Sequence, residues 1–198
     1  MSLVACNESL RPSSSPLILS LLARKIAACG LDGLRLSGFS PQIPGKIDVL
    51  IRPIREMDLE SWRPLWNGYN AFYGRHGDKA LSPDITQSTW RRFLDPTEPV
   101  FALVAECDGG LVGLTHYLFH RSTTKIECVC YLQDLFTDPA VRGQGIGRRL
   151  IESVYEQAKL AGAKRVYWQT QVTNDAGRAL YDKVATHSGF IVYSHEEQ

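Results

Sequence analysis

The sequence lacks a charge excess of either sign, because 22 lysines and arginines balance 21 aspartates and glutamates and leave a net charge of +1. Proteins that bind nucleic acid or an anionic membrane through their overall charge carry a marked basic excess. The balance therefore predicts no nucleic-acid partner and no membrane partner, although it is compatible with a local basic patch. The chain has 198 residues, 44% of them apolar, which is enough for one domain with a buried core and an additional segment.

Cysteine is scarce, and the five that occur have an odd count and no paired spacing: Cys6, Cys29, Cys107, Cys128 and Cys130. A disulfide framework is therefore not expected. A metal site at the last two would need more nitrogen or sulfur ligands close in the sequence, and these are missing. We expect reduced, buried thiols, no metal and a cytoplasmic protein.

Long hydrophobic runs are also missing. The apolar run at residues 17–29 is too short to span a bilayer, and Arg24 and Lys25 interrupt it. A secretory signal ending at the lipoprotein-like "IAAC" is one alternative, but the two basic residues fall where its apolar region should continue. A transit peptide is another, since the segment is poor in acids. We favour a poorly ordered N-terminal extension, residues 1–46, that carries a short helix and precedes a folded domain over residues 47–198.

The periodicity of apolar residues from position 47 onward predicts a regular order of elements. Strands are predicted at 47–54, 100–107, 111–120, 126–137, 164–171 and 190–194, and helices at 59–74, 85–95, 146–161 and 175–189. Asp58 is a candidate N-cap for the first helix, Ser82 and Asp84 are candidate caps for the second, and Pro64 predicts a kink or a late helix start. Asp-Gly-Gly at 108–110 predicts a hairpin. The order β-α-α-β-β-β-α-β-α-β is that of an α/β (α+β) fold, with a mixed, largely antiparallel sheet and helices on both faces.

Three alternating glycines, Gly143, Gly145 and Gly147, stand directly before the helix predicted at 146–161. Its apolar face comprises Ile146, Leu150, Ile151, Val154, Tyr155 and Ala158. A helix start offers unpaired N–H groups and partial positive charge, so a phosphate or pyrophosphate is the natural ligand. Nearby arginines add to that charge: Arg142, Arg148 and Arg149. A Walker loop and a dinucleotide fingerprint both differ from this pattern. A tight turn without a ligand is the alternative.

Three segments together resemble a known family. "VRGQGIGRRL" is similar to the acetyl-coenzyme A loop of the GCN5-related N-acetyltransferases, whose pattern is filled by Arg142, Gly145 and Gly147. "YLQDLFTDP" resembles the strand at that family's cofactor edge. "NDAGRALYDKVATHSGF" resembles its last characteristic segment and contains Asn174 and Tyr181. The element order matches as well, and the resemblance covers about residues 48–194.

The resemblance implies transfer of an acetyl group from acetyl-CoA, as cosubstrate, to a primary amine. It implies a cofactor site formed by the backbone of Leu135, Phe136 and Thr137, by Arg142, Gly143, Gln144, Gly145, Ile146, Gly147 and Arg148, and by Asn174. Tyr181 takes the position of the acid that protonates the departing thiolate. We expect a small-molecule acceptor (polyamine, diamine or amino acid) and a homodimer. A protein lysine or N-terminus, or a non-catalytic acetyl-CoA-binding module, are the alternatives.

The general base is the point where the sequence departs from the family, because Gln133 replaces the usual glutamate and cannot accept a proton. An alkylammonium has a pKa near 10.4, so deprotonating it at pH 7 requires about 4–5 kcal/mol. Asp134 is the candidate base, although on an ideal strand it faces away from Gln133. A bulge would re-aim one of the two. A purely structural carboxylate is the alternative, and Glu127 and Glu106 are weaker candidates.

Aromatic residues at helical spacing are candidates for the acceptor pocket. Tyr69, Phe72 and Tyr73 recur at helical spacing on the helix predicted at 59–74 and are predicted to line the pocket, and Tyr69, Tyr73 and Gln133 are predicted to contact the substrate. The alternative is that these tyrosines, and Tyr181 too, are plain core residues. Four tryptophans are expected in the core or at an interface: Trp62, Trp66, Trp90 and Trp168.

Overall fold

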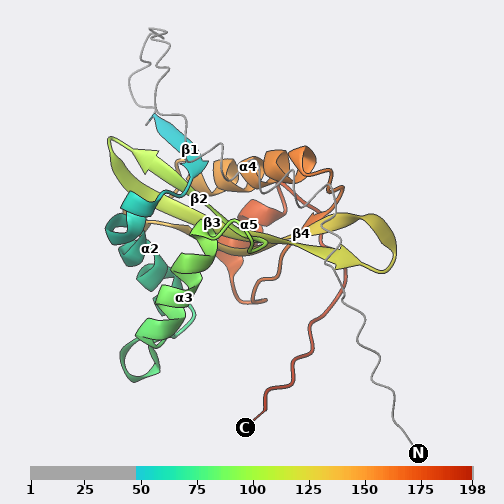
Figure 1. Cartoon of the computed structure of the whole chain (residues 1–198), viewed down its shortest axis with the longest axis horizontal. Helices are drawn as coiled ribbons and strands as arrows, with labels where there is room; N and C mark the ends of the chain where they lie inside the picture. Colours follow the sequence, from blue (N-terminus) through green and yellow to red (C-terminus); the bar gives the residue numbers. More distant parts are fainter. Residues whose placement is uncertain (1–47, 198) are drawn as a thin grey trace, which may run out of the picture.

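A five-stranded sheet organises the domain in the computed structural model, which describes residues 48–197 (Figure 1). The strands follow one another in chain order: β1 (Val49–Pro53), β2 (Val100–Cys107), β3 (Gly110–Ser122), β4 (Lys125–Thr137) and β5 (Val166–Tyr167). The first four are antiparallel, and β5 runs parallel to β4. The predicted extension at 1–46 lies outside the described residues.

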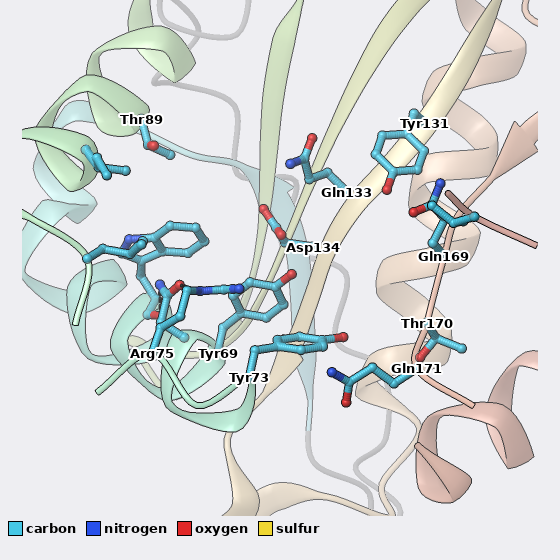
Figure 2. A pocket seen from close by; sticks show the side chains of 15 residues that line it. Tyr69, Tyr73, Arg75, Thr89, Tyr131, Gln133, Asp134, Gln169, Thr170 and Gln171 are labelled. Carbon is cyan, nitrogen blue, oxygen red and sulfur yellow. Dashed lines mark hydrogen bonds between the residues drawn. The ribbon is translucent and has the colours of Figure 1, made fainter. Parts of the chain in front are cut away.

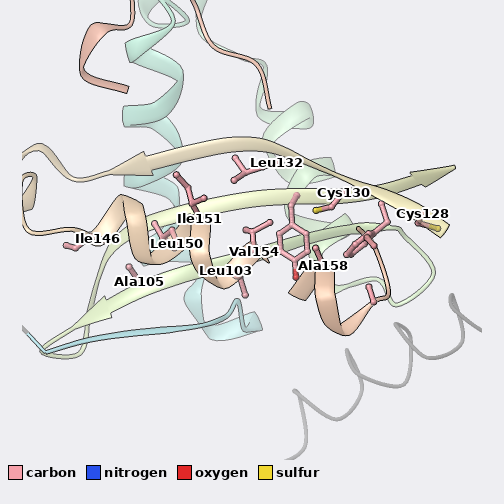
Figure 3. Close-up of a cluster of buried hydrophobic side chains, with 14 of the residues drawn as sticks. Leu103, Ala105, Cys128, Cys130, Leu132, Ile146, Leu150, Ile151, Val154 and Ala158 are labelled. Atoms are coloured by element: carbon pink, nitrogen blue, oxygen red, sulfur yellow. The ribbon is translucent and has the colours of Figure 1, made fainter. Parts of the chain in front are cut away.

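Helices cover both faces of this sheet, as predicted. On one face lie α2 (Leu59–Phe72) and α3 (Pro83–Leu94), whose aromatic side chains form a core with Val104, Leu114 and Phe136. On the other face α4 (Ile146–Leu160) packs against Leu103, Cys130 and Leu132, with α5 (Asp175–Tyr181) beside it (Figure 3). Short 3-10 turns occupy Glu56–Asp58, Gly77–Lys79 and Pro139–Val141. Within the described residues no helix is long and apolar enough to cross a membrane.

The predicted hairpin is confirmed. Cys107 pairs with Gly110, and the two residues between them have positive φ angles, 50° at Asp108 and 78° at Gly109. Left-handed conformations at both central positions define the type I′ turn, whose twist matches that of the flanking strands. Asp and Gly are among the few residues that adopt it at low cost, so the local sequence determines this turn.

A β-bulge in β4 decides which side chains reach which core. His116 pairs with Asp134, whereas its neighbour Tyr117 pairs with Leu132, so Gln133 has no partner on β3. Side chains normally alternate along a strand, and positions 132 and 134 would share a face. The extra residue reverses the alternation. Leu132 therefore packs under α4, whereas Asp134 lies against His116 on the opposite face.

Several boundaries differ from the prediction. The strand predicted at 164–171 is reduced to Val166–Tyr167, and the helix predicted at 175–189 ends at Tyr181, after which turns continue to Ala185. The final strand at 190–194 is wrong: this segment has no strand conformation, and Phe190, Ile191, Val192 and Tyr193 are exposed. A strand needs a neighbour to pair its backbone groups, and β5 is too short to offer one.

The residues predicted to cap the first two helices have different roles in the structure. Of the two caps predicted for α3, Ser82 is the N-cap, since its Oγ accepts from the backbone N–H of Ile85 at 3.4 Å, whereas Asp84 lies inside the first turn. Asp58 precedes α2, but its carboxylate accepts instead from Arg52 at 2.6 Å and from the backbone N–H of Arg55 at 2.7 Å. Burial acts to raise the pKa of Asp58, and these hydrogen bonds outweigh it and lower the pKa. Pro64 causes no late start, because α2 begins at Leu59.

Candidate active site

The site forms where β4 and β5 separate. The two parallel strands pair only at Cys130–Val166 and Tyr131–Tyr167, and the chain after Tyr167 leaves the sheet. On the α2 and α3 side of the sheet this opening widens into a cavity of about 590 Å³ (Figure 2). Its walls are Trp66, Tyr69, Asn70, Tyr73, Arg75, Leu81, Ile85, Thr89, Tyr131, Gln133, Asp134, Gln169, Thr170, Gln171 and Val192. The volume suits a small organic molecule.

Asp134 lies at the wall of this cavity and is held there by a chain of two buried hydrogen bonds. Its Oδ2 lies 2.8 Å from Nδ1 of His116, and Nε2 of His116 lies 3.1 Å from the indole nitrogen of Trp62. An indole N–H can only donate, so Nε2 is the acceptor and the imidazole proton sits on Nδ1, facing Asp134. This arrangement makes His116 neutral and Asp134 the hydrogen-bond acceptor. Both nitrogens of His116 are thus occupied, which leaves Asp134 as the candidate proton acceptor of the pair.

Two tyrosines line the cavity beside this carboxylate. Burial, the charge of Asp134 and a hydrogen bond with that side chain raise the pKa of the Tyr69 hydroxyl well above its ordinary value. Burial and Asp134 also raise the pKa of Tyr73, although Arg75 and a hydrogen bond with Thr170 act in the opposite direction. Both phenols thus stay protonated at physiological pH and act as hydrogen-bond donors.

The residues predicted to meet the acceptor are brought together, except Phe72, which is exposed and does not line the cavity. Tyr69, Tyr73, Gln133 and Asp134 all line the cavity, with Gln133 exposed and Asp134 8% exposed. The bulge at Gln133 explains how two adjacent strand residues reach one space. The weaker base candidates lie elsewhere: Glu106 pairs with Arg52 at 2.5 Å, and Glu127 pairs with Lys164 at 3.3 Å.

The three glycines of the loop differ in backbone conformation and in what surrounds them. Gly143 and Gly145 have φ angles of 80° and 81°, which other residues adopt only under strain, and open space surrounds the position of a Cβ on either. Gly147 differs from these two, because a Cβ there would lie 3.2 Å from the side chain of Leu180, a close contact. Ile146 is buried in the core under α4. The loop thus leaves an uncrowded helix start, where backbone N–H groups could hold phosphate oxygens.

The arginines around this loop divide into two groups. Arg142 donates from Nε to the carbonyl of Thr137 at 3.1 Å and lies over the ring of Phe136, and Arg148 lies 4.0 Å from Glu152 on the exposed side of α4. Both remain beside the helix start. Arg149 instead reaches back to the backbone carbonyl of Val49, so it ties α4 to β1. The contribution of Arg149 to a phosphate site, expected from sequence, is therefore not supported.

The cofactor edge of β4 is open at the predicted residues. Leu135, Phe136 and Thr137 pair with β3 on one side, whereas on the other side β5 has already ended at Tyr167. Among residues 48–197 no strand pairs with that second edge. Its backbone groups are thus available to an extended ligand, as strand edges commonly are.

Asn174 and Tyr181 lie across the opening on the α5 side. Asn174 caps α5, accepting from the N–H of Gly177 at 3.1 Å and donating to Thr170 at 2.9 Å. Tyr181 packs edge-on against Trp168, and burial, with a smaller effect of Tyr73, raises the pKa of its hydroxyl to about 12. Tyr181 does not itself line the cavity and packs against the core cluster under α4.

Sequence reasoning missed three functional candidates: His116, Trp62 and Arg75. A histidine within the apolar run of β3 is a signal that a buried polar partner exists, but the partner's identity depends on strand register. The described part of the chain contains no group of three or more histidine, cysteine or acidic side chains placed to hold a metal ion. Cys128 and Cys130 are free thiols buried in the core under α4, as predicted, whereas the free thiol of Cys107 is only partly buried, and Cys6 and Cys29 lie outside the described residues.

A mixed sheet that opens between two parallel strands brings a glycine loop at a helix start and a buried carboxylate to one opening, an arrangement suited to an acyltransferase. The family model described as the Acetyltransferase (GNAT) family matches residues 54–185, and the chain belongs to that family. It is an N-acetyltransferase. The fold class predicted from sequence is confirmed.

Two relatives and one solved structure give the range of similarity. The D-amino-acid N-acetyltransferase HPA3 of Saccharomyces cerevisiae is 34% identical over 147 residues, covering 73% of this chain and 89% of the relative. The uncharacterized N-acetyltransferase YhfO of Bacillus subtilis is 30% identical over 145 residues, covering 72% and 94%. The aminoglycoside N-acetyltransferase AAC(6')-Iy, solved in complex with CoA, superposes with a TM-score of 0.65 at 17% identity, covering 79% and 100%.

Proposed function

We propose that the protein transfers the acetyl group of acetyl-CoA to the primary amine of a small molecule, an amino acid, diamine or polyamine. The observation that carries this proposal is the carboxylate of Asp134, held by His116 at 2.8 Å on the wall of a cavity sized for a small molecule. The similarity to a D-amino-acid N-acetyltransferase supports a small acceptor.

The cofactor would lie along the open edge of β4. The backbone of Leu135, Phe136 and Thr137 would hold the pantetheine arm, and the loop from Arg142 to Arg148 would hold the pyrophosphate. The two left-handed glycines support this placement, because their φ angles and open surroundings keep the helix start clear. Asn174 would contact the same arm from the α5 side.

The reaction needs a proton acceptor and a proton donor. Asp134 would take the proton of the acceptor's ammonium group, because only the neutral amine is a nucleophile. The amine nitrogen then forms a bond to the acetyl carbon, and the carbon–sulfur bond breaks when the tetrahedral intermediate collapses. Tyr181 would give its proton to the departing thiolate, and the resulting tyrosinate would regain a proton from the nitrogen, through solvent, as the amide forms. Asp134 would release the first proton to solvent after the products leave. Gln133, Tyr69 and Tyr73 would orient the acceptor.

The test is thiol release from acetyl-CoA with a panel of amino acids, diamines and polyamines, and with a lysine-containing peptide. Turnover of small amines, with acetylated product identified by mass spectrometry, is the expected result. Turnover of the peptide alone would favour a protein acceptor. Binding of acetyl-CoA without turnover on any acceptor would overturn the proposal in favour of a non-catalytic binding module. The homodimer, the cytoplasmic location and the domain boundary at residue 47 stay predictions.

A further inference from the structure

One cationic side chain lines the acceptor cavity without an anionic partner. Arg75 follows the end of α2, where Gly74 has a φ angle of 76° and turns the chain back toward Asn70. Of the side chains on the cavity wall that carry a full charge at neutral pH, Asp134 is the sole acid and Arg75 the sole base among the described residues. The two do not form an ion pair with each other, nor does Arg75 pair with any other acid of residues 48–197.

The guanidinium is held in place by neutral groups. Its Nε donates to Oδ1 of Asn70 at 2.7 Å, and the amide of Asn70 is fixed in turn by a bond to the carbonyl of Trp66 at 2.8 Å. Its central carbon lies 5.7 Å from the ring centre of Tyr69 and 5.3 Å from that of Tyr73. Figure 2 shows Arg75 beside the Tyr69 ring.

This arrangement leaves the outer donors of the guanidinium free. Arginine has five N–H donors in a rigid fork, and Asn70 uses only the one on Nε. Within the described chain, the two terminal nitrogens have no hydrogen-bond partner. Such a fork matches the two oxygens of a carboxylate.

We propose that Arg75 binds the carboxylate of the acceptor, so that the preferred substrate is an amino acid and not a diamine or polyamine. An amino acid carries an amine for Asp134 and a carboxylate for Arg75, which matches the opposite charges on the wall. A polyamine would bring a second cation toward Arg75, and that repulsion discriminates against it. The aromatic and aliphatic lining from Trp66, Leu81 and Ile85 suits an apolar side chain. This inference rests on the proposed function, because it assigns the acceptor of the same site.

The test compares phenylalanine of each hand with phenylalaninamide, phenethylamine and putrescine, in the native protein and in Arg75→Gln. The native protein should prefer one form of phenylalanine over its amide. A hydrogen-bonded charge contributes about 1.5–3 kcal/mol, so Arg75→Gln should reduce that preference by about 10- to 100-fold. Because the preference is a ratio between two acceptors, differences in their intrinsic reactivity cancel when the variant is compared with the native protein. Arg75→Lys should restore part of the preference.

Arg63→Gln is the matched control, since Arg63 lies on α2, is half exposed and does not line the cavity. It should leave the ratio unchanged. An equal loss for the acid and the amide in Arg75→Gln, with a lower melting temperature, would overturn the proposal and make Arg75 a support for the two tyrosine rings. A native protein that acetylates amines without regard to the carboxylate would also overturn it while sustaining the proposed function. Failure with every amine would overturn both.

Discussion

Nδ1 of His116 lies 2.8 Å from Oδ2 of Asp134, and this contact exists because a bulge at Gln133 reverses the side-chain alternation of β4. The histidine is 2% exposed and its other nitrogen is occupied by Trp62. The pair therefore presents a fixed acceptor to the cavity. The chemistry of the site depends on a strand irregularity more than on any single motif.

Asp134→Asn should lower kcat by about 10²–10⁴, because an amide cannot accept the proton of the attacking amine. Gln133→Ala should have a much smaller effect, and Gln133→Glu should keep activity. Steady-state kinetics with the best acceptor of the panel measures all three. A larger loss in Gln133→Ala than in Asp134→Asn would refute the assignment of Asp134 as the base.

His116 is a positioning residue, and its conservative variant should separate that role from packing. His116→Leu removes the donor to Asp134 and should lower kcat by at least about tenfold, since a lost bond to a charged group is worth about 1.5–3 kcal/mol. His116→Asn places an amide N–H near the former Nδ1 and should recover much of kcat. The KM for acetyl-CoA should stay constant in both. Equal kcat losses in the two variants, tracking their melting temperatures, would reduce His116 to a core residue.

Tyr181→Phe keeps the ring against Trp168 but removes the proton for the thiolate, so kcat should fall by about 10². The Kd of acetyl-CoA should change little, because the hydroxyl matters mainly as charge develops on sulfur. Since burial raises the pKa of Tyr181 to about 12, the native hydroxyl stays protonated to pH 10, and its ionisation should cause no loss of activity below that pH. Near-normal turnover in the variant would return Tyr181 to the core and leave water as the acid.

Gly145→Asp should weaken acetyl-CoA binding by at least about tenfold, or 1.4 kcal/mol, by placing a negative charge at the phosphate site. Gly109→Asp is its matched control. Gly109 has a similar φ angle, 78° against 81°, and equally open surroundings, but it lies in the β2–β3 turn. Both variants should lose some stability in thermal melts, and only Gly145→Asp should change the Kd measured by calorimetry. An equal Kd in the two variants would remove the loop from the cofactor site.

Cys130 should make the protein less stable in alkali. Burial raises the pKa of its thiol from 9.0 to about 12, so the unfolded chain ionises first as pH rises above 9. The stability from the protonated thiol is complete below pH 9 and falls by about 1 kcal/mol between pH 9 and 10. Cys130→Ala should have a lower melting temperature at pH 7.5 but a smaller further drop at pH 10. An identical drop in the native protein and the variant would contradict this assignment.

The local chemistry of the residues was sufficient to predict several elements of the structure. Asp108 and Gly109 determine the hairpin turn because few other residues adopt its left-handed angles, and Ser82 starts α3 because its hydroxyl satisfies a free N–H. Gly143 and Gly145 were recognisable as a ligand loop because glycines without a Cβ let the backbone at a helix start approach a phosphate. The strand at 190–194 could not be predicted correctly in this way, since a strand exists only where a neighbouring edge is available.

What the sequence alone determined is thus the class of fold, the glycine loop and the residue types able to move a proton, since these follow from backbone conformation and side-chain chemistry. Only the tertiary structure decided which of these residues meet. Strand register brings His116 to Asp134 across a separation of 18 residues, and the bulge turns Asp134 out of the core under α4. The turn at Gly74 brings Arg75 to the cavity and leaves its outer donors free. Such contacts depend on pairing between distant segments, which no local pattern encodes, because a shift of one residue in register moves every following side chain to the other face.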